Sequence, residues 1–244
     1  MIVTEHLQKS FGPVKAVRDV SFVAADGQIT GLLGPNGAGK TTTLRMLYSL
    51  LPPDAGSIRI DGIDPQRDAL KVKTSLGVVP DARGLYARLS ARENIAYFGK
   101  LHGIGKAALE QRIADLSDQL DLHDFIDRRT EGFSQGQRVR VALARALVHQ
   151  PKTLLLDEPS NGLDVMSTRA LRDMLLRLRA AGHCIVLSTH IMQEVAALCD
   201  RIVIIADGVV AADGTADELR QQAGTSELED AFVQLIGSEE GLLA

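Results

Sequence analysis

The chain has 244 residues, of which 45 % are hydrophobic and 24 % charged, and its formal net charge is −4. This length supports one large domain, or one domain with a subdomain, around a sizeable core. The charge balance lacks the basic surface typical of nucleic-acid binding, so we expect no nucleic-acid partner. No apolar run approaches the roughly 18 residues of a membrane-spanning helix, and the first residues show no signal-peptide pattern. We therefore expect a cytoplasmic protein.

The first 31 residues contain short strand-like runs separated by turn residues. Residues 21–24 and 28–31 flank Ala25-Asp26-Gly27, and Asp-Gly between two such runs predicts a β-hairpin. We expect an antiparallel β layer that leads into a buried strand ending near Leu33. Phe11 has two interpretations in this segment: a core side chain, which is the commoner case, or a ring that stacks on a base.

A glycine-rich turn follows the buried strand and precedes a helical pattern. It fits the phosphate-loop pattern G-x-x-x-x-G-K-[ST] without a mismatch, and a chance match is on the order of one per cent. The backbone N–H groups and helix dipole of such a turn attract phosphate oxygens, the lysine reaches the β- and γ-phosphates, and the hydroxyl binds Mg²⁺. We therefore predict a nucleotide phosphate site, with Thr41 as a magnesium ligand, made by Gly34, Pro35, Asn36, Gly37, Ala38, Gly39, Lys40, Thr41 and Thr42.

Two strand-like runs, residues 57–62 and 76–80, come before a helical pattern at about residues 84–150. We interpret this pattern as a helical subdomain inserted between core strands. Within it, Ser134 and Gln137 have the spacing of a capping box at a helix start. Such a helix start either completes only its own first turn or presents free N–H groups and a hydroxyl to a phosphate. The local pattern leaves both interpretations open.

The second half of the chain alternates between strand and helix patterns. Strands alternating with helices predict a mostly parallel α/β sheet that binds ligands at the carboxyl ends of its strands. Lys40, Asp157 and His190 each follow a predicted strand, so we expect one site to collect them. The predicted strands are 153–157, 184–188, 201–205 and 209–212, and the predicted helices are 166–180 and 192–198.

Asp157 and Glu158 are adjacent carboxylates at the end of an apolar strand. Beside a phosphate loop, the first suits Mg²⁺ held through a water, and the second suits the orientation or deprotonation of an attacking water. The alternative is a helix N-cap with a solvated neighbour. His190 is either an ordinary strand-end histidine or a donor to a γ-phosphate oxygen.

Together these motifs resemble the nucleotide-binding subunits of ABC transporters over about residues 2–215. They occur in the family's order: the aromatic residue Phe11, the Walker A phosphate loop at 34–42, the signature segment at 133–137, the Walker B strand ending in Asp157-Glu158, the D-loop at 160–164 and the switch histidine His190. The resemblance implies a P-loop NTPase core with a mostly parallel sheet, an N-terminal antiparallel β layer and an inserted α-helical subdomain. It also implies ATP and Mg²⁺ as ligands and ATP hydrolysis as the activity. Residue by residue, it implies that Phe11 stacks on adenine, Glu158 is the catalytic carboxylate and His190 contacts the γ-phosphate.

The resemblance further implies a head-to-tail dimer of two copies around two ATP–Mg²⁺, which drives a separate integral-membrane permease. Ser134, Gly136 and Gln137 would address ATP bound to the opposite subunit, and Asp164 would lie at the dimer interface. Contact with the permease would place the protein at the cytoplasmic face of the membrane, as a peripheral subunit.

Two positions depart from the family pattern. Gln135 stands where the signature has glycine, which costs on the order of 1 kcal/mol if the position needs a positive φ. Asp81 stands where the family's Q-loop carries glutamine. Because carboxylates are good ligands for Mg²⁺, we predict that Asp81 contacts Mg²⁺ or its water.

Residues 80–94 and the tail segment 228–232 resemble the ATPase subunits of sodium exporters in the ABC-2 type export branch. Drug and polysaccharide exporters of that branch share much of this pattern and are the alternative. The tail, residues 216–244, either caps the domain or forms a partner surface. A soluble ABC ATPase that acts on ribosomes or DNA is disfavoured because the chain has one cassette and no long coiled-coil insertion. A GTP-binding module is disfavoured because no Asn-Lys-x-Asp motif is present.

Overall fold

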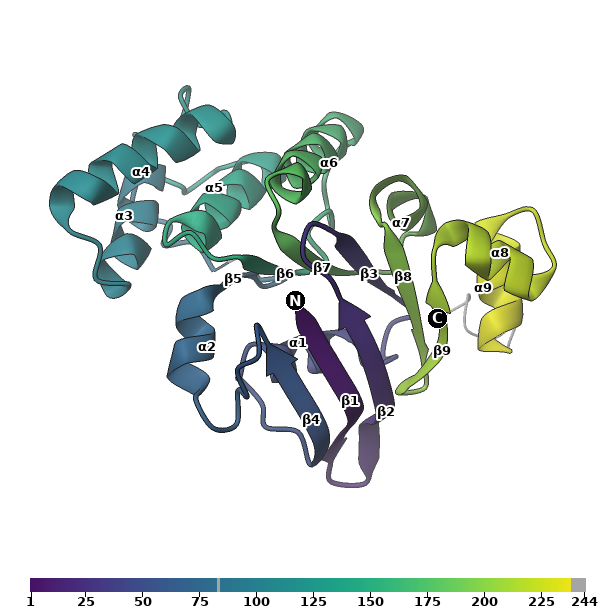
Figure 1. Ribbon diagram of the computed structural model, residues 1–244. Helices are drawn as coiled ribbons and strands as arrows, with labels where there is room; N and C mark the ends of the chain where they lie inside the picture. The colour runs from purple at the N-terminus through teal and green to yellow at the C-terminus, as the bar shows by residue number, and fades with distance from the viewer. Residues whose placement is uncertain (83, 238–244) are drawn as a thin grey trace.

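The computed structural model describes residues 1–82 and 84–237, so Arg83 and residues 238–244 of the tail lie outside the described residues. In the described part of the chain, nine strands form one mixed sheet with the order β4-β1-β2-β9-β8-β3-β7-β6-β5 (Figure 1). This arrangement confirms the predicted α/β class. The strands are β1 (Ile2–Phe11), β2 (Val14–Ala24), β3 (Ile29–Leu33), β4 (Ala55–Ile60), β5 (Leu76–Val79), β6 (Thr153–Asp157), β7 (Cys184–Thr189), β8 (Arg201–Ala206) and β9 (Val209–Gly214). The helices are α1 (Lys40–Leu47), α2 (Ala69–Ser75), α3 (Ala91–Leu101), α4 (Lys106–Gln119), α5 (Gln135–Leu147), α6 (Val165–Ala180), α7 (Met192–Leu198), α8 (Ala216–Ala223) and α9 (Leu228–Ile236).

The central strands β3, β6 and β7 are buried along their whole length. Strand β7 pairs in parallel with both β3 and β6, and β8 pairs in parallel with the other side of β3. Figure 1 shows helices α3 to α6 over one face of these strands, with α1 and the antiparallel strands β1, β2 and β4 on the other. Burial on both faces explains why the central strands read as continuous apolar runs rather than alternating ones.

The predicted hairpin around Asp26-Gly27 is wrong. Strand β2 pairs antiparallel with β1 and, at its other edge, in parallel with β9. Within the described residues, the partners of β3 are β7 and β8. Asp26 and Gly27 do turn the chain, and Gly27 has φ 68°. A turn motif indicates only that the chain reverses locally. All five residues of β3 are buried, and burial between two parallel strands stabilises this strand more than pairing at a sheet edge would. The antiparallel hairpin of this layer is β1–β2.

The predicted helical segment contains α3, α4 and α5, and α5 also packs on β5. Capping boxes start both α3, through Ser90 and Glu93, and α5, through Ser134 and Gln137. The close approach of α5 to β5 depends on Gly77, because a Cβ there would lie 2.5 Å from the Ala146 carbonyl oxygen. This contact holds the helical segment against the sheet that contains β6.

The C-terminal helices α8 and α9 pack against the hairpin of β8 and β9. Leu219 of α8 and Phe232 of α9 are buried in one cluster with Leu33, Val195 and Ile204. The described part of the tail therefore covers the domain rather than leaving it. No helix within residues 1–82 and 84–237 has the length and apolar character that crossing a bilayer requires.

Replacing Gly77 by Ala is expected to lower the free energy of unfolding by about 1–3 kcal/mol, because the added methyl group overpacks the contact between β5 and α5. Urea unfolding followed by circular dichroism measures the change. Gly105→Ala is the matched control, since no atom of the described residues lies within 4 Å of a Cβ added there and its φ is −66°. Equal stability of wild type and Gly77→Ala would contradict the close contact.

Candidate nucleotide site

A cavity of about 650 Å³ contains most of the predicted site residues. The lining residues are Phe11, Ala16, Asn36, Gly37, Ala38, Gly39, Lys40, Thr41, Thr42, Asp81, Glu158, Asn161 and His190. Ala16 and Asn161 are additions to the predicted set. Three predicted residues contact the lining instead: the carbonyls of Gly34 and Pro35 accept hydrogen bonds from Lys40, and Asp157 accepts one from Thr41.

Parallel register explains why segments distant in the sequence meet here. Leu33 of β3 lies opposite Thr189 of β7, and Asp157 of β6 lies opposite Ser188 of β7. The three strands therefore end at the same level, and the loops that follow them share one edge of the sheet, as expected for a parallel α/β fold.

The phosphate loop depends on glycine at two positions for different reasons. Gly39 has φ 104°, and a Cβ there would lie 2.5 Å from the Ala16 carbonyl oxygen. Gly34 would place a Cβ 2.1 Å from the Ile205 carbonyl oxygen. Helix α1 begins at Lys40 with no side chain capping it, so its first N–H groups have no side-chain acceptor at the helix start. Such a helix start favours an anion.

The Lys40 ammonium is buried and donates hydrogen bonds to the carbonyl oxygens of Gly34 at 2.7 Å and Pro35 at 3.1 Å. Its Nζ lies 3.7 Å from Oε1 of Glu158. Burial lowers the pKa of Lys40, and the nearby Glu158 carboxylate partly opposes this change. A phosphate would add negative charge beside this ammonium and so favour its charged form.

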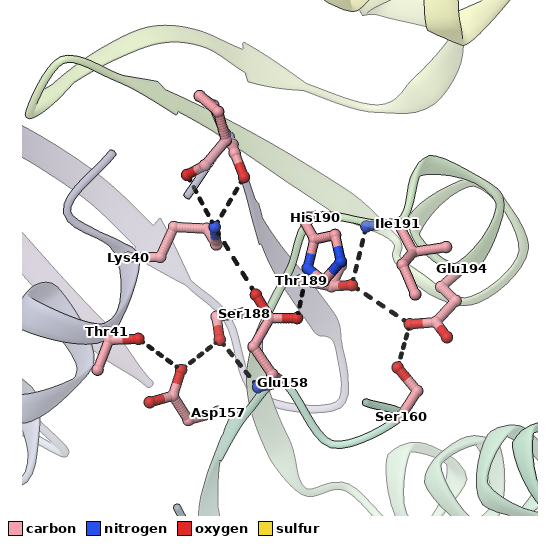
Figure 2. A network of polar contacts seen from close by, with 12 residues as sticks. Lys40, Thr41, Asp157, Glu158, Ser160, Ser188, Thr189, His190, Ile191 and Glu194 are labelled. Atoms are coloured by element: carbon pink, nitrogen blue, oxygen red, sulfur yellow. Dashed lines mark hydrogen bonds and ion pairs between the residues drawn. The ribbon is translucent and has the colours of Figure 1, made fainter. Parts of the chain in front are cut away.

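Asp157 is buried and accepts two hydrogen bonds at the same oxygen. The Thr41 hydroxyl donates to Oδ1 at 3.0 Å and the Ser188 hydroxyl donates to it at 2.6 Å (Figure 2). Among the described residues, no group of three or more His, Cys, Asp or Glu side chains is placed to hold a metal ion. Mg²⁺ commonly uses one or two carboxylates and completes its shell with water and phosphate oxygens. The adjacent hydroxyl and carboxylate of Thr41 and Asp157 fit that pattern.

Glu158 connects the phosphate loop to the switch histidine. Its Oε2 lies 3.0 Å from Nδ1 of His190, while its other oxygen faces Lys40 (Figure 2). The backbone of Glu158 has φ 47°, a left-handed conformation that an L-residue adopts at a cost of about 1–2 kcal/mol. Residues held in such conformations concentrate at functional sites. The two side chains that the sequence places 32 residues apart thus share one contact.

Glu194 of α7 links Ser160, in the loop after β6, to the end of β7. Its Oε2 accepts hydrogen bonds from the Ser160 hydroxyl at 2.5 Å and the Thr189 hydroxyl at 3.3 Å. Thr189 in turn accepts from the Ile191 N–H. Because His190 lies between Thr189 and Ile191, this network braces the backbone of the switch histidine. Glu194 could not be identified from the sequence, because its role depends on the packing of α7.

Phe11 ends β1 with its side chain 47 % exposed, so its interpretation as a core residue is wrong. The ring lines the cavity, and the Lys9 ammonium lies 5.9 Å from its centroid. Asp54 fixes this strand end, because its carboxylate accepts from Lys9 at 2.7 Å and from the Ser10 N–H at 2.7 Å. The hydrogen bond from Lys9 is the main reason that the pKa of Asp54 is lowered.

The signature residues lie outside this cavity. Ser134 and Gln137 form the capping box of α5, so the structural interpretation of that pattern is confirmed, and their role toward a phosphate stays a prediction. Gln135 is the first residue of the helix and does not have the positive φ that would strain it. A Cβ on Gly136 would lie 2.6 Å from the Ser167 hydroxyl oxygen. Asp164 caps α6 through the same Ser167, and this hydrogen bonding lowers the pKa of Asp164.

Gly39→Ala is expected to weaken ATP binding at least about tenfold, because neither its φ nor the Ala16 carbonyl tolerates a Cβ and the loop must shift. Equilibrium binding of a fluorescent ATP analogue measures the loss. Gly27→Ala is the control, since Gly27 also has a positive φ but, in the part of the chain that the structure describes, no atom lies within 4 Å of an added Cβ. ATP affinity that falls equally in both variants would contradict the assignment of this loop.

A family model, related sequences and solved structures all indicate the same family. The ABC transporter family model matches residues 17–161. The chain is 43 % identical over 221 residues to the ABC transporter ATP-binding protein NatA of Bacillus subtilis, covering 90 % of each chain. It is 38 % identical to the doxorubicin resistance ATP-binding protein DrrA of Mycobacterium tuberculosis, covering 97 % of this chain and 75 % of that protein.

Solved structures share the fold. The ATP-binding subunit of an ABC transporter superposes with a TM-score of 0.87 at 30 % identity, covering 96 % of this chain and 99 % of that one. A dimeric ATP-binding cassette in a post-hydrolysis state, bound to ADP and Pi, gives a TM-score of 0.80 at 25 % identity, covering 88 % of this chain and 98 % of that one. With the cavity geometry above, these matches show that the chain belongs to the ABC transporter family and is an ATP-binding ATPase subunit.

Proposed function

We propose that this ATPase dimerises head to tail around two ATP–Mg²⁺ and powers a separate membrane permease for export. The observation that carries the proposal is one cavity that brings the phosphate loop together with Asp81, Glu158 and His190. The proposed cassette comprises residues 1–215, with the helical subdomain at about 84–150, and residues 216–244 form a C-terminal extension.

In the proposed mechanism, Lys40 exchanges its bonds to the Gly34 and Pro35 carbonyls for bonds to the β- and γ-phosphates. Thr41 and Asp157 would hold Mg²⁺, and Asp81 would contact the ion or its water. When bound, the ion would supply charge neutralisation at the phosphates. Glu158 orients the attacking water and accepts its proton. His190 holds Glu158 in place through their 3.0 Å contact and also contacts the γ-phosphate.

Phe11 and the dimer partner would complete each site. The exposed ring of Phe11 offers a stacking surface for adenine. Ser134, Gly136 and Gln137 lie outside their own chain's cavity, at the start of α5, and Asp164 lies on the exposed start of α6. A second copy placed head to tail would bring these residues to the first copy's ATP, and the dimeric form of a solved relative supports this arrangement.

A permease partner would hold the subunit at the cytoplasmic face of the membrane. Sodium is the proposed cargo, from the resemblance of residues 80–94 and 228–232 to the ATPase subunits of sodium exporters. A drug is the second candidate, because DrrA, a doxorubicin resistance protein, is 38 % identical. Vesicles that contain the subunit with its permease distinguish these cargoes by ATP-dependent transport of labelled Na⁺ or of doxorubicin.

Glu158→Gln is expected to lower kcat for ATP hydrolysis by about 10²-fold or more, because the amide keeps the size of the side chain but cannot accept a proton. Size-exclusion chromatography in ATP–Mg²⁺ should then show a trapped dimer. Glu110→Gln, on the exposed surface of α4, is the control. Unchanged turnover would remove Glu158 from catalysis, and a monomeric mutant would contradict the composite site.

Asp81→Asn is expected to raise the Mg²⁺ concentration that gives half-maximal ATP hydrolysis several-fold, because the amide keeps the size of Asp81 but loses its charge beside the cation. A Mg²⁺ titration at saturating ATP measures the shift. Asp68→Asn, at the start of α2 and outside the cavity lining, is the control. An identical Mg²⁺ dependence in Asp81→Asn and wild type would contradict the contact.

A further inference from the structure

Ser188 stands between the two carboxylate residues of the site. It lies on β7, is fully buried, and its register partner on β6 is Asp157. The Ser188 Oγ is 2.6 Å from Oδ1 of Asp157 and 3.0 Å from the backbone nitrogen of Glu158 (Figure 2). One hydroxyl group therefore contacts both residues of the Walker B pair.

The direction of each hydrogen bond follows from the chemistry of the groups. The Glu158 backbone N–H can only donate, so the Ser188 oxygen accepts from it. A serine hydroxyl has a single proton, and that proton is directed to the Asp157 carboxylate. Because Thr41 donates to the same Oδ1, the Asp157 side chain is held from two sides. A hydrogen bond from a neutral donor to an ionised carboxylate is stronger than a hydrogen bond between two neutral groups.

The second contact acts on the backbone of Glu158, which has φ 47°. A left-handed conformation at a residue other than glycine persists only where the surroundings determine it. The Glu158 N–H is directed toward Ser188, through both its hydroxyl at 3.0 Å and its carbonyl oxygen at 3.2 Å. Ser188 therefore helps to set the direction in which the Glu158 side chain leaves the backbone toward His190.

We propose that Ser188 is a positioning residue that orients the magnesium-binding carboxylate of Asp157 and the catalytic carboxylate of Glu158 together. This inference rests on the proposed function of those two residues. It adds a residue that is not among the lining residues of the cavity and that acts through its hydroxyl. The Ser-Thr-His sequence gives no sign of it, because the contact arises from the pairing of β6 with β7.

The experiment compares Ser188→Ala and Ser188→Cys with wild type and Ser188→Thr. Alanine removes both contacts of the hydroxyl and keeps the backbone carbonyl that also accepts from the Glu158 N–H. Cysteine keeps the shape with a much weaker donor and acceptor, and threonine retains the hydroxyl. Thr30→Val is the matched control: Thr30 is buried on the neighbouring strand β3, and its hydroxyl has no hydrogen-bond partner among the described residues. The readouts are the Mg²⁺ dependence of fluorescent-ATP binding, kcat and KM for ATP, and thermal unfolding.

In Ser188→Ala and Ser188→Cys we expect kcat to fall about tenfold or more, as for misplaced catalytic groups, with KM within about twofold. The Mg²⁺ concentration for half-maximal nucleotide binding should rise at least about threefold. Ser188→Thr should restore both values, and Thr30→Val should resemble wild type. Circular dichroism and nucleotide binding without Mg²⁺ identify any variant that has not folded. If Ser188→Ala does not fold, Ser188→Cys is compared with wild type instead.

Wild-type Mg²⁺ dependence and kcat in folded Ser188→Ala and Ser188→Cys would overturn the inference while leaving the proposed function intact. A folded Ser188→Thr that behaves like Ser188→Ala would also overturn it, because the hydroxyl would then not be the active feature. A wild-type protein that neither binds nor hydrolyses ATP would instead overturn the proposed function on which the inference rests.

Discussion

Parallel pairing of three buried strands is the constraint on which the site depends. Strands β3, β7 and β6 are in parallel register, so they end at the same edge of the sheet. The pairing of the strands alone therefore brings together the phosphate loop, His190 and the Walker B carboxylates. The helices that cover this sheet add burial, which makes the register hard to shift: a slip by one residue would reverse every side chain of a strand. Positions at the edge are therefore fixed by the core beneath them.

Charge in the site is balanced locally and in a way that leaves room for an anion. The buried ammonium of Lys40 is offset by two backbone carbonyls and by one oxygen of Glu158 at 3.7 Å, while the other oxygen of Glu158 faces His190. Backbone carbonyls are weak partners for a buried cation compared with a phosphate. The Lys40 ammonium can therefore exchange its hydrogen bonds to the loop carbonyls for stronger hydrogen bonds to a phosphate.

The sequence predicted the parts of the fold and site that depend on local patterns. The strands that end at Leu33 and Asp157 could be predicted because short apolar runs precede each chemical motif. The hairpin at Asp26-Gly27 was wrong because a turn signal does not say which strand will become a neighbour. Ser188 could not be identified because its role exists only across the β6–β7 pairing. The exposed side chain of Phe11 likewise depends on where β1 ends in three dimensions.

The order of the strands also determines when the phosphate loop can become rigid. Strand β3 ends at Leu33, but its two neighbours begin only at Cys184 and Arg201. Closing such long loops has an entropic cost and makes folding slow, since non-local pairs form late. During synthesis, the mostly apolar β3 segment therefore has neither of its two neighbouring strands to pair with. Unpaired apolar strands of this kind associate with other chains. A nascent chain that has not yet reached β8 carries the complete phosphate-loop sequence without the sheet that gives it shape.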